Sequence, residues 1–197
     1  MSTDAARPEP RIPRGFRDLA AADATARRKM LATIAEVYER FGFEPLETPA
    51  LEYVDALGKF LPESDTPAGG VFSLRDDDGQ WIALRYDLTA PLSRFYAQSA
   101  NQLTSPFRRY QIGPVWRQEK PGPGRFREFY QCDVDAIGTR SMMVEAEQLA
   151  AASEILARLG FPDFTVRLNH RQVLAGALDA AGVAKALHAD ALVALDK

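Results

Sequence analysis

Two neighbouring stretches of this chain alternate between polar and apolar residues, and they carry the side chains best suited to chemistry. The stretches are residues 107–119 and 125–135, and a Lys-Pro-Gly-Pro-Gly loop, residues 120–124, joins them. A period of two predicts two strands of a hairpin. Because successive side chains of a strand point to opposite faces, one face gathers arginines, carboxylates, amides and an aromatic ring. The members of this polar face are Arg109, Gln111, Arg117, Glu119, Arg125, Arg127, Phe129, Gln131, Asp133 and Asp135.

Such a face suits a ligand that has phosphates, a flat ring and a polar head. Arginines such as Arg117 and Arg125 match phosphate oxygens bidentately and stay charged at physiological pH. Phe129 could stack on a nucleobase, and Gln131 and Asp135 could accept hydrogen bonds from a small substrate. The alternative is an ordinary solvated hairpin face, which more typically carries Lys, Thr and Glu. The residue types therefore favour a nucleotide-binding site.

Several segments of the chain resemble the class II aminoacyl-tRNA synthetases, and the histidyl-tRNA synthetase family among them. Residues 117–119, the loop and residues 124–129 resemble the second motif of that class, and residues 130–135 resemble its histidine-specific continuation. Residues 42–49 resemble the first motif, and residues 85–91 resemble the segment that holds histidine. Residues 13–18 also fit, so the resemblance runs from about residue 12 to residue 171.

The resemblance implies a reaction and a role for each matching residue. In this family the carboxylate of histidine attacks the α-phosphate of ATP, and a terminal hydroxyl of the tRNA then takes the histidyl group. The nucleophile arrives ionised, so catalysis comes mostly from positioning and from neutralising charge. The implied catalytic residue is Arg117, at the α-phosphate. The implied ATP-binding residues are Arg117, Glu119 at the adenine amino group, Phe129 stacked on the ring and Arg125 at the distal phosphates. The implied histidine-binding residues are Asp87 and Thr89 at the α-amino group, Gln131 nearby and Asp135 toward the imidazole.

The resemblance also implies partners and a metal. We expect ATP as a substrate with Mg²⁺ bridging its phosphates through carboxylates and waters, and no metal site made by the protein alone. L-histidine and tRNA(His) are the other expected partners. A homodimer through the first-motif segment, residues 42–49, is expected as well.

Three positions depart from the usual pattern of the family. Many members carry glutamate where this chain has Asp87 and Asp135. Aspartate is one methylene shorter, so its contacts with histidine are expected to run through water. His170 lies where the family usually has asparagine. It shares parity with the apolar residues of 164–168, which predicts a packed core histidine, whereas His188 is expected at the surface.

Two other functions remain open. A regulatory, histidine-sensing subunit of ATP phosphoribosyltransferase shares this fold and parts of the same motifs, and a nucleotide-binding module without histidine chemistry is the third reading. The third motif, a second histidine-specific segment and an anticodon-binding domain are not found in the sequence. We therefore expect an N-terminal portion of a synthetase that by itself shows little adenylation.

Composition bounds the class of protein. The chain has 197 residues, of which 46% are hydrophobic and 26% charged, as in soluble globular proteins. A net charge of −3 excludes a generally basic coat, so tRNA contacts would need local patches such as Arg108, Arg109, Arg125 and Arg127. Cys132 is the sole cysteine, fits a reducing cytoplasm, and its parity predicts packing in the core. No apolar run approaches the ~18 residues of a membrane span.

The elements that would position the polar face alternate between helix and strand. Helices are expected at residues 23–40, 91–99 and 141–159, with Thr89 as a cap and Gly42 after the first helix. Strands are expected at 44–48, 71–74, 81–86 and 164–169, and the remainder looks helical. The acidic run 76–78 is expected to be a solvated turn rather than a metal site. The pattern predicts an α+β fold, an antiparallel sheet flanked by helices, with residues 1–12 a disordered arm and 13–197 a synthetase-like catalytic domain.

Overall fold

The computed structural model describes residues 9–57 and 70–195, arranged in two compact units, Met1–Phe161 and Pro162–Lys197. Of the predicted disordered arm, residues 1–8 lie outside the described residues, and residues 9–12 are exposed and irregular. The first unit contains every residue of the predicted site.

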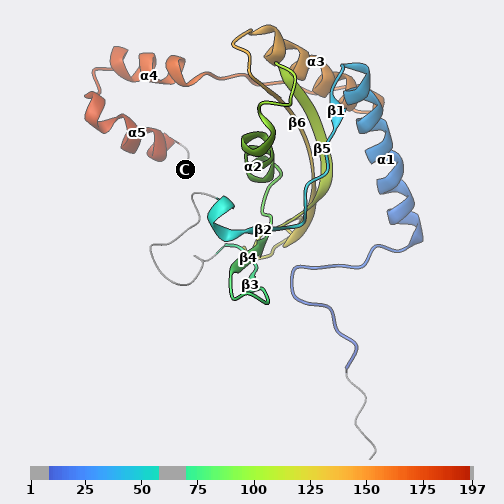
Figure 1. The fold of residues 1–197 in the computed structure, drawn as a ribbon. Coiled ribbons are helices and arrows are strands. Elements are labelled where there is room, and N and C mark those ends of the chain that lie inside the picture. Colours follow the sequence, from blue (N-terminus) through green and yellow to red (C-terminus); the bar gives the residue numbers. More distant parts are fainter. Residues whose placement is uncertain (1–8, 58–69, 196–197) are drawn as a thin grey trace, which may run out of the picture. The chain divides into compact units, whose positions relative to one another are not determined.

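A long antiparallel hairpin forms the backbone of the first unit (Figure 1). Its strands are β5 (Phe107–Trp116) and β6 (Glu128–Ile137), and the short β1 (Glu44–Pro45) pairs with β5 in parallel, giving the order β1-β5-β6. The two strands of the hairpin confirm the predicted period of two. Both are shorter than expected, because the chain leaves the ladder after Trp116 and returns at Glu128. Arg117, Glu119, Arg125 and Arg127 therefore belong to the connection between the strands.

The apolar face of the hairpin builds the main core. Helices α1 (Ala21–Arg40) and α3 (Met143–Arg158) pack on it, on the side away from α2 (Figure 1). The Tyr38 hydroxyl donates to the carbonyl of Cys132 at 2.9 Å, which ties α1 to β6. Cys132 is partly buried against this core, which agrees with its predicted packing role. The buried members of this core are Ile34, Val37, Tyr38, Phe43, Tyr110, Ala151 and Ile155.

Both helices end in the same way, and glycine is required there. Gly42 and Gly160 have φ angles of 76° and 88°, a left-handed conformation that residues with a Cβ rarely adopt. The N–H groups of Gly42 and Phe43 donate to the carbonyls of Glu39 and Tyr38. These paired bonds are the Schellman arrangement, which turns the chain from α1 into β1 as the sequence predicted.

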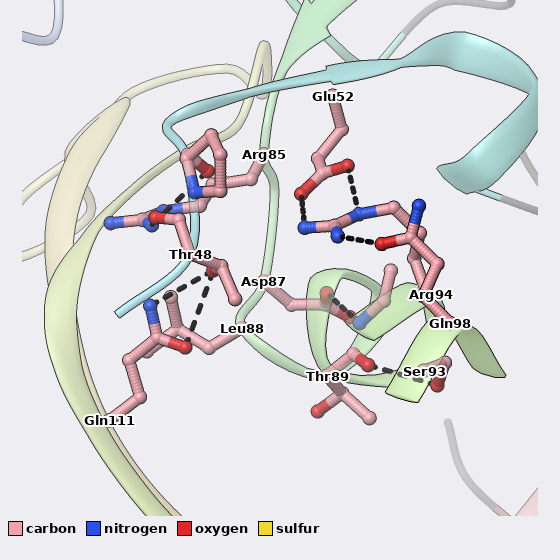
Figure 2. Close-up of polar contacts among 12 residues, drawn as sticks. Thr48, Glu52, Arg85, Asp87, Leu88, Thr89, Ser93, Arg94, Gln98 and Gln111 are labelled. Carbon is pink, nitrogen blue, oxygen red and sulfur yellow. Dashed lines mark hydrogen bonds and ion pairs between the residues drawn. The ribbon is translucent and has the colours of Figure 1, made fainter. Parts of the chain in front are cut away.

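A smaller antiparallel sheet and one helix complete the first unit. The sheet has the order β2-β4-β3, with β2 (Leu51–Tyr53), β3 (Ser73–Arg75) and β4 (Trp81–Leu84), and the 3-10 turn η1 (Val54–Leu57) follows β2. Strand β2 was not predicted. Helix α2 (Thr89–Ser99) is tied to β2 by Arg94, whose Nε and Nη2 both lie 2.7 Å from the buried carboxylate of Glu52 (Figure 2). The unit is thus α+β, as expected.

The second unit carries α4 (Arg171–Ala180), the 3-10 turn η2 (Lys185–Leu187) and α5 (His188–Leu195), which confirms the predicted helices. The strand predicted at residues 164–169 is wrong: the segment is exposed and, within the described part of the chain, pairs with no strand. Alternation predicts a strand only where a partner strand is present to satisfy its backbone.

The two histidines of this unit also differ from prediction. His170 is exposed, and its Nδ1 accepts from the N–H of Gln172 at 3.2 Å, so it caps α4 rather than packing in a core. His188 is not fully at the surface, because its side chain is 16% exposed and its Nε2 lies 3.0 Å from the carbonyl of Val183. No helix in the described ranges is long and apolar enough to cross a membrane.

Candidate active site

The second face of the hairpin brings the predicted site residues into one row. The register places Arg109 opposite Asp135, Gln111 opposite Asp133, Gly113 opposite Gln131 and Val115 opposite Phe129. Directly opposed residues of an antiparallel pair share a face. Phe129, Gln131 and Asp135 therefore lie along one side of β6, as the sequence predicted.

Arg85 fastens the predicted histidine-binding segment across this face. Its buried guanidinium donates from Nη1 to the carbonyl of Thr48 at 2.6 Å (Figure 2). Its Nε donates to the carbonyl of Pro114 at 3.0 Å. The Arg85 carbonyl in turn accepts from the N–H of Trp116 at 3.0 Å. These bonds hold the chain that follows Arg85 against the end of β5, so residues 86–89 border the polar face.

Gly113 makes this close approach possible. A Cβ on Gly113 would lie 2.7 Å from Nη2 of Arg85, a distance that no relaxed contact allows. The guanidinium cannot swing aside freely, because the carbonyls of Thr48, Pro49 and Pro114 hold it.

We expect Gly113→Ala to lower the free energy of unfolding by about 1–3 kcal/mol, the usual cost of forcing extra volume into a packed site. Thermal or urea unfolding measures it. Gly122→Ala is the matched control, because a Cβ there meets nothing within 4 Å. Equal stability of the two variants would contradict the account of Gly113.

Asp87 starts helix α2. Its Oδ1 accepts from the N–H of Ala90 at 2.9 Å (Figure 2), which satisfies one of the free donors at the helix N-terminus. The cap predicted at Thr89 is therefore wrong: Thr89 is already the first helical residue and is exposed. Asp87 thus fixes the turn that carries both predicted ligands of the histidine α-amino group.

Arg109 is buried at the centre of the site, which the sequence did not predict. Its side chain is 0% exposed, and Nη2 lies 2.7 Å from Oδ2 of Asp135 and donates to the carbonyl of Leu88 at 3.1 Å. The prediction that Arg109 contributes to a tRNA-binding patch is therefore wrong, because a tRNA could not reach this buried side chain. Arg108 is likewise engaged, because it pairs with Glu147 at 2.6 Å and donates to the carbonyl of Phe41 at 2.7 Å.

Three carboxylates surround this single arginine. Burial raises the pKa of Asp135 and of Asp133, and the charge of Arg109 opposes that rise. Asp87 adds repulsion to both carboxylates. When all are ionised, the cluster has more negative than positive charge, so it favours a ligand that brings a cation or several N–H donors.

Gln131 leaves a strong polar atom unused beside this cluster. Its Oε1 is buried and has no hydrogen-bond partner in the described part of the chain, and the same is true of Nε of Arg109. Buried polar atoms are nearly always satisfied, so an orphaned acceptor in a site calls for a donor. An ammonium group is a ligand of that chemistry.

The predicted pair for a nucleotide lies at the end of the hairpin where the connection joins β5 to β6. Arg117 donates from Nε to the carbonyl of Tyr86 at 3.1 Å, and its guanidinium carbon lies 5.1 Å from the ring centroid of Phe129. Both side chains are half-buried. The structure thus brings the guanidinium of Arg117 and the ring of Phe129 together. Phe129 lies in the same row of β6 side chains as the carboxylates of Asp133 and Asp135.

The connection between the strands holds the other two predicted ATP ligands. Arg125 forms an ion pair with Glu119 and is 67% exposed. Arg127 braces the connection, because its Nε donates to the carbonyl of Glu119 at 2.9 Å and its N–H donates to the carbonyl of Gly15 at 2.8 Å. The opening segment, residues 13–18, therefore packs under this connection, and Arg125 stays accessible.

Other chemistry has little support in the described ranges. They contain no group of three or more His, Cys, Asp or Glu residues that could hold a metal. The acidic run is a turn, as predicted, in which Oδ1 of Asp76 accepts from the N–H groups of Asp78 and Gln80. Burial raises the pKa of the Cys132 thiol to about 11, so it stays protonated and is a poor nucleophile.

Comparisons with known proteins show which family the chain resembles in sequence and in fold. A family profile described as histidyl-tRNA synthetase matches residues 15–197. The histidine–tRNA ligase of Cereibacter sphaeroides is 58% identical over 179 residues, which cover 90% of this chain and 36% of that relative. The chain thus spans little more than a third of the length of this relative.

Two solved structures are similar in fold. The histidyl-tRNA synthetase of Nostoc sp. PCC 7120 has a TM-score of 0.81 and 32% identity, over 95% of this chain and 43% of its own. A Bacillus halodurans protein described as an ATP phosphoribosyltransferase regulatory subunit/histidyl-tRNA synthetase has a TM-score of 0.66 and 29% identity, over 76% of this chain and 38% of its own. With the profile matching all but the first residues, the chain belongs to the histidyl-tRNA synthetase family.

Proposed function

We propose that the full-length protein containing this chain is a histidine–tRNA ligase. It joins the carboxylate of histidine to the α-phosphate of ATP, releasing pyrophosphate, and then passes the histidyl group to a terminal hydroxyl of tRNA(His), releasing AMP. The observation that carries this proposal is the single row formed by Phe129, Gln131 and Asp135 on β6, bordered by Asp87 and Arg117. One end of this row, near Arg117 and Phe129, suits a nucleotide. The other end, near Asp87, Gln131 and Asp135, suits an ammonium group.

Histidine fits the acidic end of the row. Its ammonium group would meet Asp87 and Thr89 at the start of α2 and the orphaned Oε1 of Gln131. Its imidazole N–H would be received by Asp135, whose side chain is 28% exposed and so still accessible. This arrangement would leave the histidine carboxylate, the nucleophile, to point toward the nucleotide end.

ATP fits the opposite end. Arg117 would neutralise charge at the α-phosphate as the carboxylate of histidine attacks and pyrophosphate leaves. Phe129 would stack on the adenine ring, and Glu119 would accept from its amino group. Glu119 is paired with Arg125, so ATP binding would separate this pair and turn Arg125 toward the distal phosphates.

Mg²⁺ would enter with ATP. The described residues supply no cluster of ligands that would hold the ion by themselves. Water and phosphate oxygens are its preferred partners when it accompanies a nucleotide.

The assembly and location follow the family. The first-motif segment, residues 42–49, is the proposed homodimer interface, and both residues of its strand β1 are exposed. A cytoplasmic location is proposed, in keeping with one free, unreactive cysteine.

A histidine-sensing regulatory subunit is the second candidate, because the Bacillus halodurans structure carries that description beside the synthetase one. Sensing histidine needs the acidic end of the row but not a nucleotide end. The pairing of Arg117 with Phe129 beside Tyr86 therefore favours the ligase.

Exchange of labelled pyrophosphate into ATP tests the proposal. Using the full-length protein, we expect exchange with histidine and none above background with the other amino acids. Exchange with a different amino acid, or none from a folded protein, would overturn it.

A further inference from the structure

One buried charge touches both halves of the proposed histidine pocket. Nη2 of Arg109 contacts Asp135 on β6 at 2.7 Å, and it also donates to the carbonyl of Leu88 at 3.1 Å. Leu88 lies between Asp87 and Thr89, where α2 begins. A single guanidinium therefore joins the two segments that supply the proposed histidine ligands.

Water cannot take over the contacts that Arg109 makes, because the side chain of Arg109 is buried. Its side chain is 0% exposed, and a buried ionised group is tolerated when it is paired and hydrogen-bonded. Asp135, by contrast, is 28% exposed. Its carboxylate therefore has a buried side that meets Arg109 and an open side that a ligand can reach.

We propose that Arg109 is a positioning residue of the histidine pocket, which holds the carboxylate of Asp135 and the turn at Leu88 in the orientation that receives histidine. This inference rests on the proposed function. Arg109 touches no substrate and acts through its two neighbours. It also compensates for the short side chain of Asp135 by fixing where that carboxylate points.

The charges around Asp135 define a pH signature for this role. The groups that face it are Arg109 from β5, Asp133 from β6, and Asp87 from the segment before α2, and its charge also reaches Tyr38 of α1. Burial raises the pKa of Asp135 and the charge of Arg109 opposes that rise. Without Arg109 the pKa rises further, so the ionised carboxylate that binds histidine is lost at a higher pH.

The test uses Arg109→Met in the full-length protein, with the KM for histidine and the KM for ATP measured by pyrophosphate exchange. We expect the histidine KM to rise at least about 10-fold, and the ATP KM to change less than about 2-fold. The rise should grow as the pH falls, and should begin at a higher pH than in the wild type. Arg109→Lys should recover part of the loss, because it restores charge without the fork.

Arg108→Met is the matched control. Arg108 precedes Arg109 on β5 and points to the opposite face. Like Arg109, it forms an ion pair, with Glu147, and donates a hydrogen bond to a backbone carbonyl, that of Phe41. Its loss should lower stability and leave the histidine KM and its pH profile unchanged. Equal histidine KM values in the two variants would overturn the positioning role.

A double-mutant cycle with Asp135→Asn locates the effect. If Arg109 acts mainly through Asp135, Arg109→Met adds little to the histidine KM once Asp135→Asn is present, whereas independent effects would multiply. Multiplying effects would overturn the part of the proposal in which Arg109 acts through Asp135. If Arg109→Met does not fold, Arg109→Gln is used instead. A wild-type histidine KM in folded Arg109→Gln would also overturn the positioning role.

The outcomes separate this inference from the proposed function. A wild-type protein that does not exchange pyrophosphate with histidine overturns both. A wild-type protein that does, together with Arg109 variants of unchanged histidine KM, overturns the positioning role alone.

Discussion

Replacing Arg117 by alanine in the full-length protein should lower kcat for adenylate formation by about 10²–10³-fold, the usual cost of removing one preorganised charge-stabilising group. The KM for histidine should change little. The reason is that the contact of Arg117 strengthens as charge develops at the α-phosphate, so it stabilises the transition state more than the bound substrates. Single-turnover formation of histidyl-adenylate measures the effect.

Two further variants make this prediction specific. Arg117→Lys should not restore the rate fully, because an ammonium cannot reproduce the planar fork that the Tyr86 carbonyl and the Phe129 ring align. Arg140→Ala, at an exposed position after β6, is the matched control and should leave kcat unchanged. Unchanged single-turnover adenylation in Arg117→Ala would remove Arg117 from the catalytic residues.

The second large effect is expected at the acidic end of the row. Gln131→Ala and Asp87→Asn should each raise the KM for histidine by ~10- to 100-fold, the range expected for losing a hydrogen bond to a charged group. Their kcat values and ATP KM values should change much less. Steady-state exchange at varied histidine concentration measures the KM.

Asp87→Asn separates binding from folding. Asparagine can still accept from the N–H of Ala90 and cap α2, whereas alanine cannot. Asp87→Ala should therefore lose about 1 kcal/mol of stability in addition to affinity, while Asp87→Asn keeps the unfolding temperature. Gln102→Ala, at an exposed turn, serves as the control for Gln131. A wild-type histidine KM in Asp87→Asn would contradict a charge contact with the ammonium group.

The sequence was sufficient for the hairpin and its two faces. Alternation is a local property, so Phe129, Gln131 and Asp135 could be placed on one side of a strand before their partners were known. Gly42 and Gly160 likewise marked the helix ends through their own backbone requirements. These predictions needed no knowledge of distant contacts.

What the sequence could not supply depends on contacts between remote segments. The alternating pattern placed Arg109 on the polar face. Its burial, however, comes from the turn at Leu88, which lies 21 residues earlier in the chain and whose carbonyl accepts a hydrogen bond from Arg109. The end of β5 is set in the same way, because the backbone N–H of Arg127 donates to the carbonyl of Gly15 rather than to that of Arg117, the residue next in register on the other strand. A local pattern contains neither fact.

The strand predicted at residues 164–169 failed for a related reason. Its alternation is real, but a strand exists through the hydrogen bonds of a neighbour. His170 then takes its role from position rather than from parity, since it precedes α4 and its ring caps the helix.

Aminoacylation of tRNA(His) with labelled histidine by the full-length protein is the most direct test of the account. We predict that histidine becomes attached to the terminal adenosine of tRNA(His), that no other amino acid is attached, and that Arg117→Ala slows the attachment by about 10²–10³-fold. A folded wild-type protein that binds histidine but attaches none to tRNA, with the Arg117→Ala variant behaving in the same way, would contradict the assignment as a ligase. That result would favour a histidine-sensing regulator.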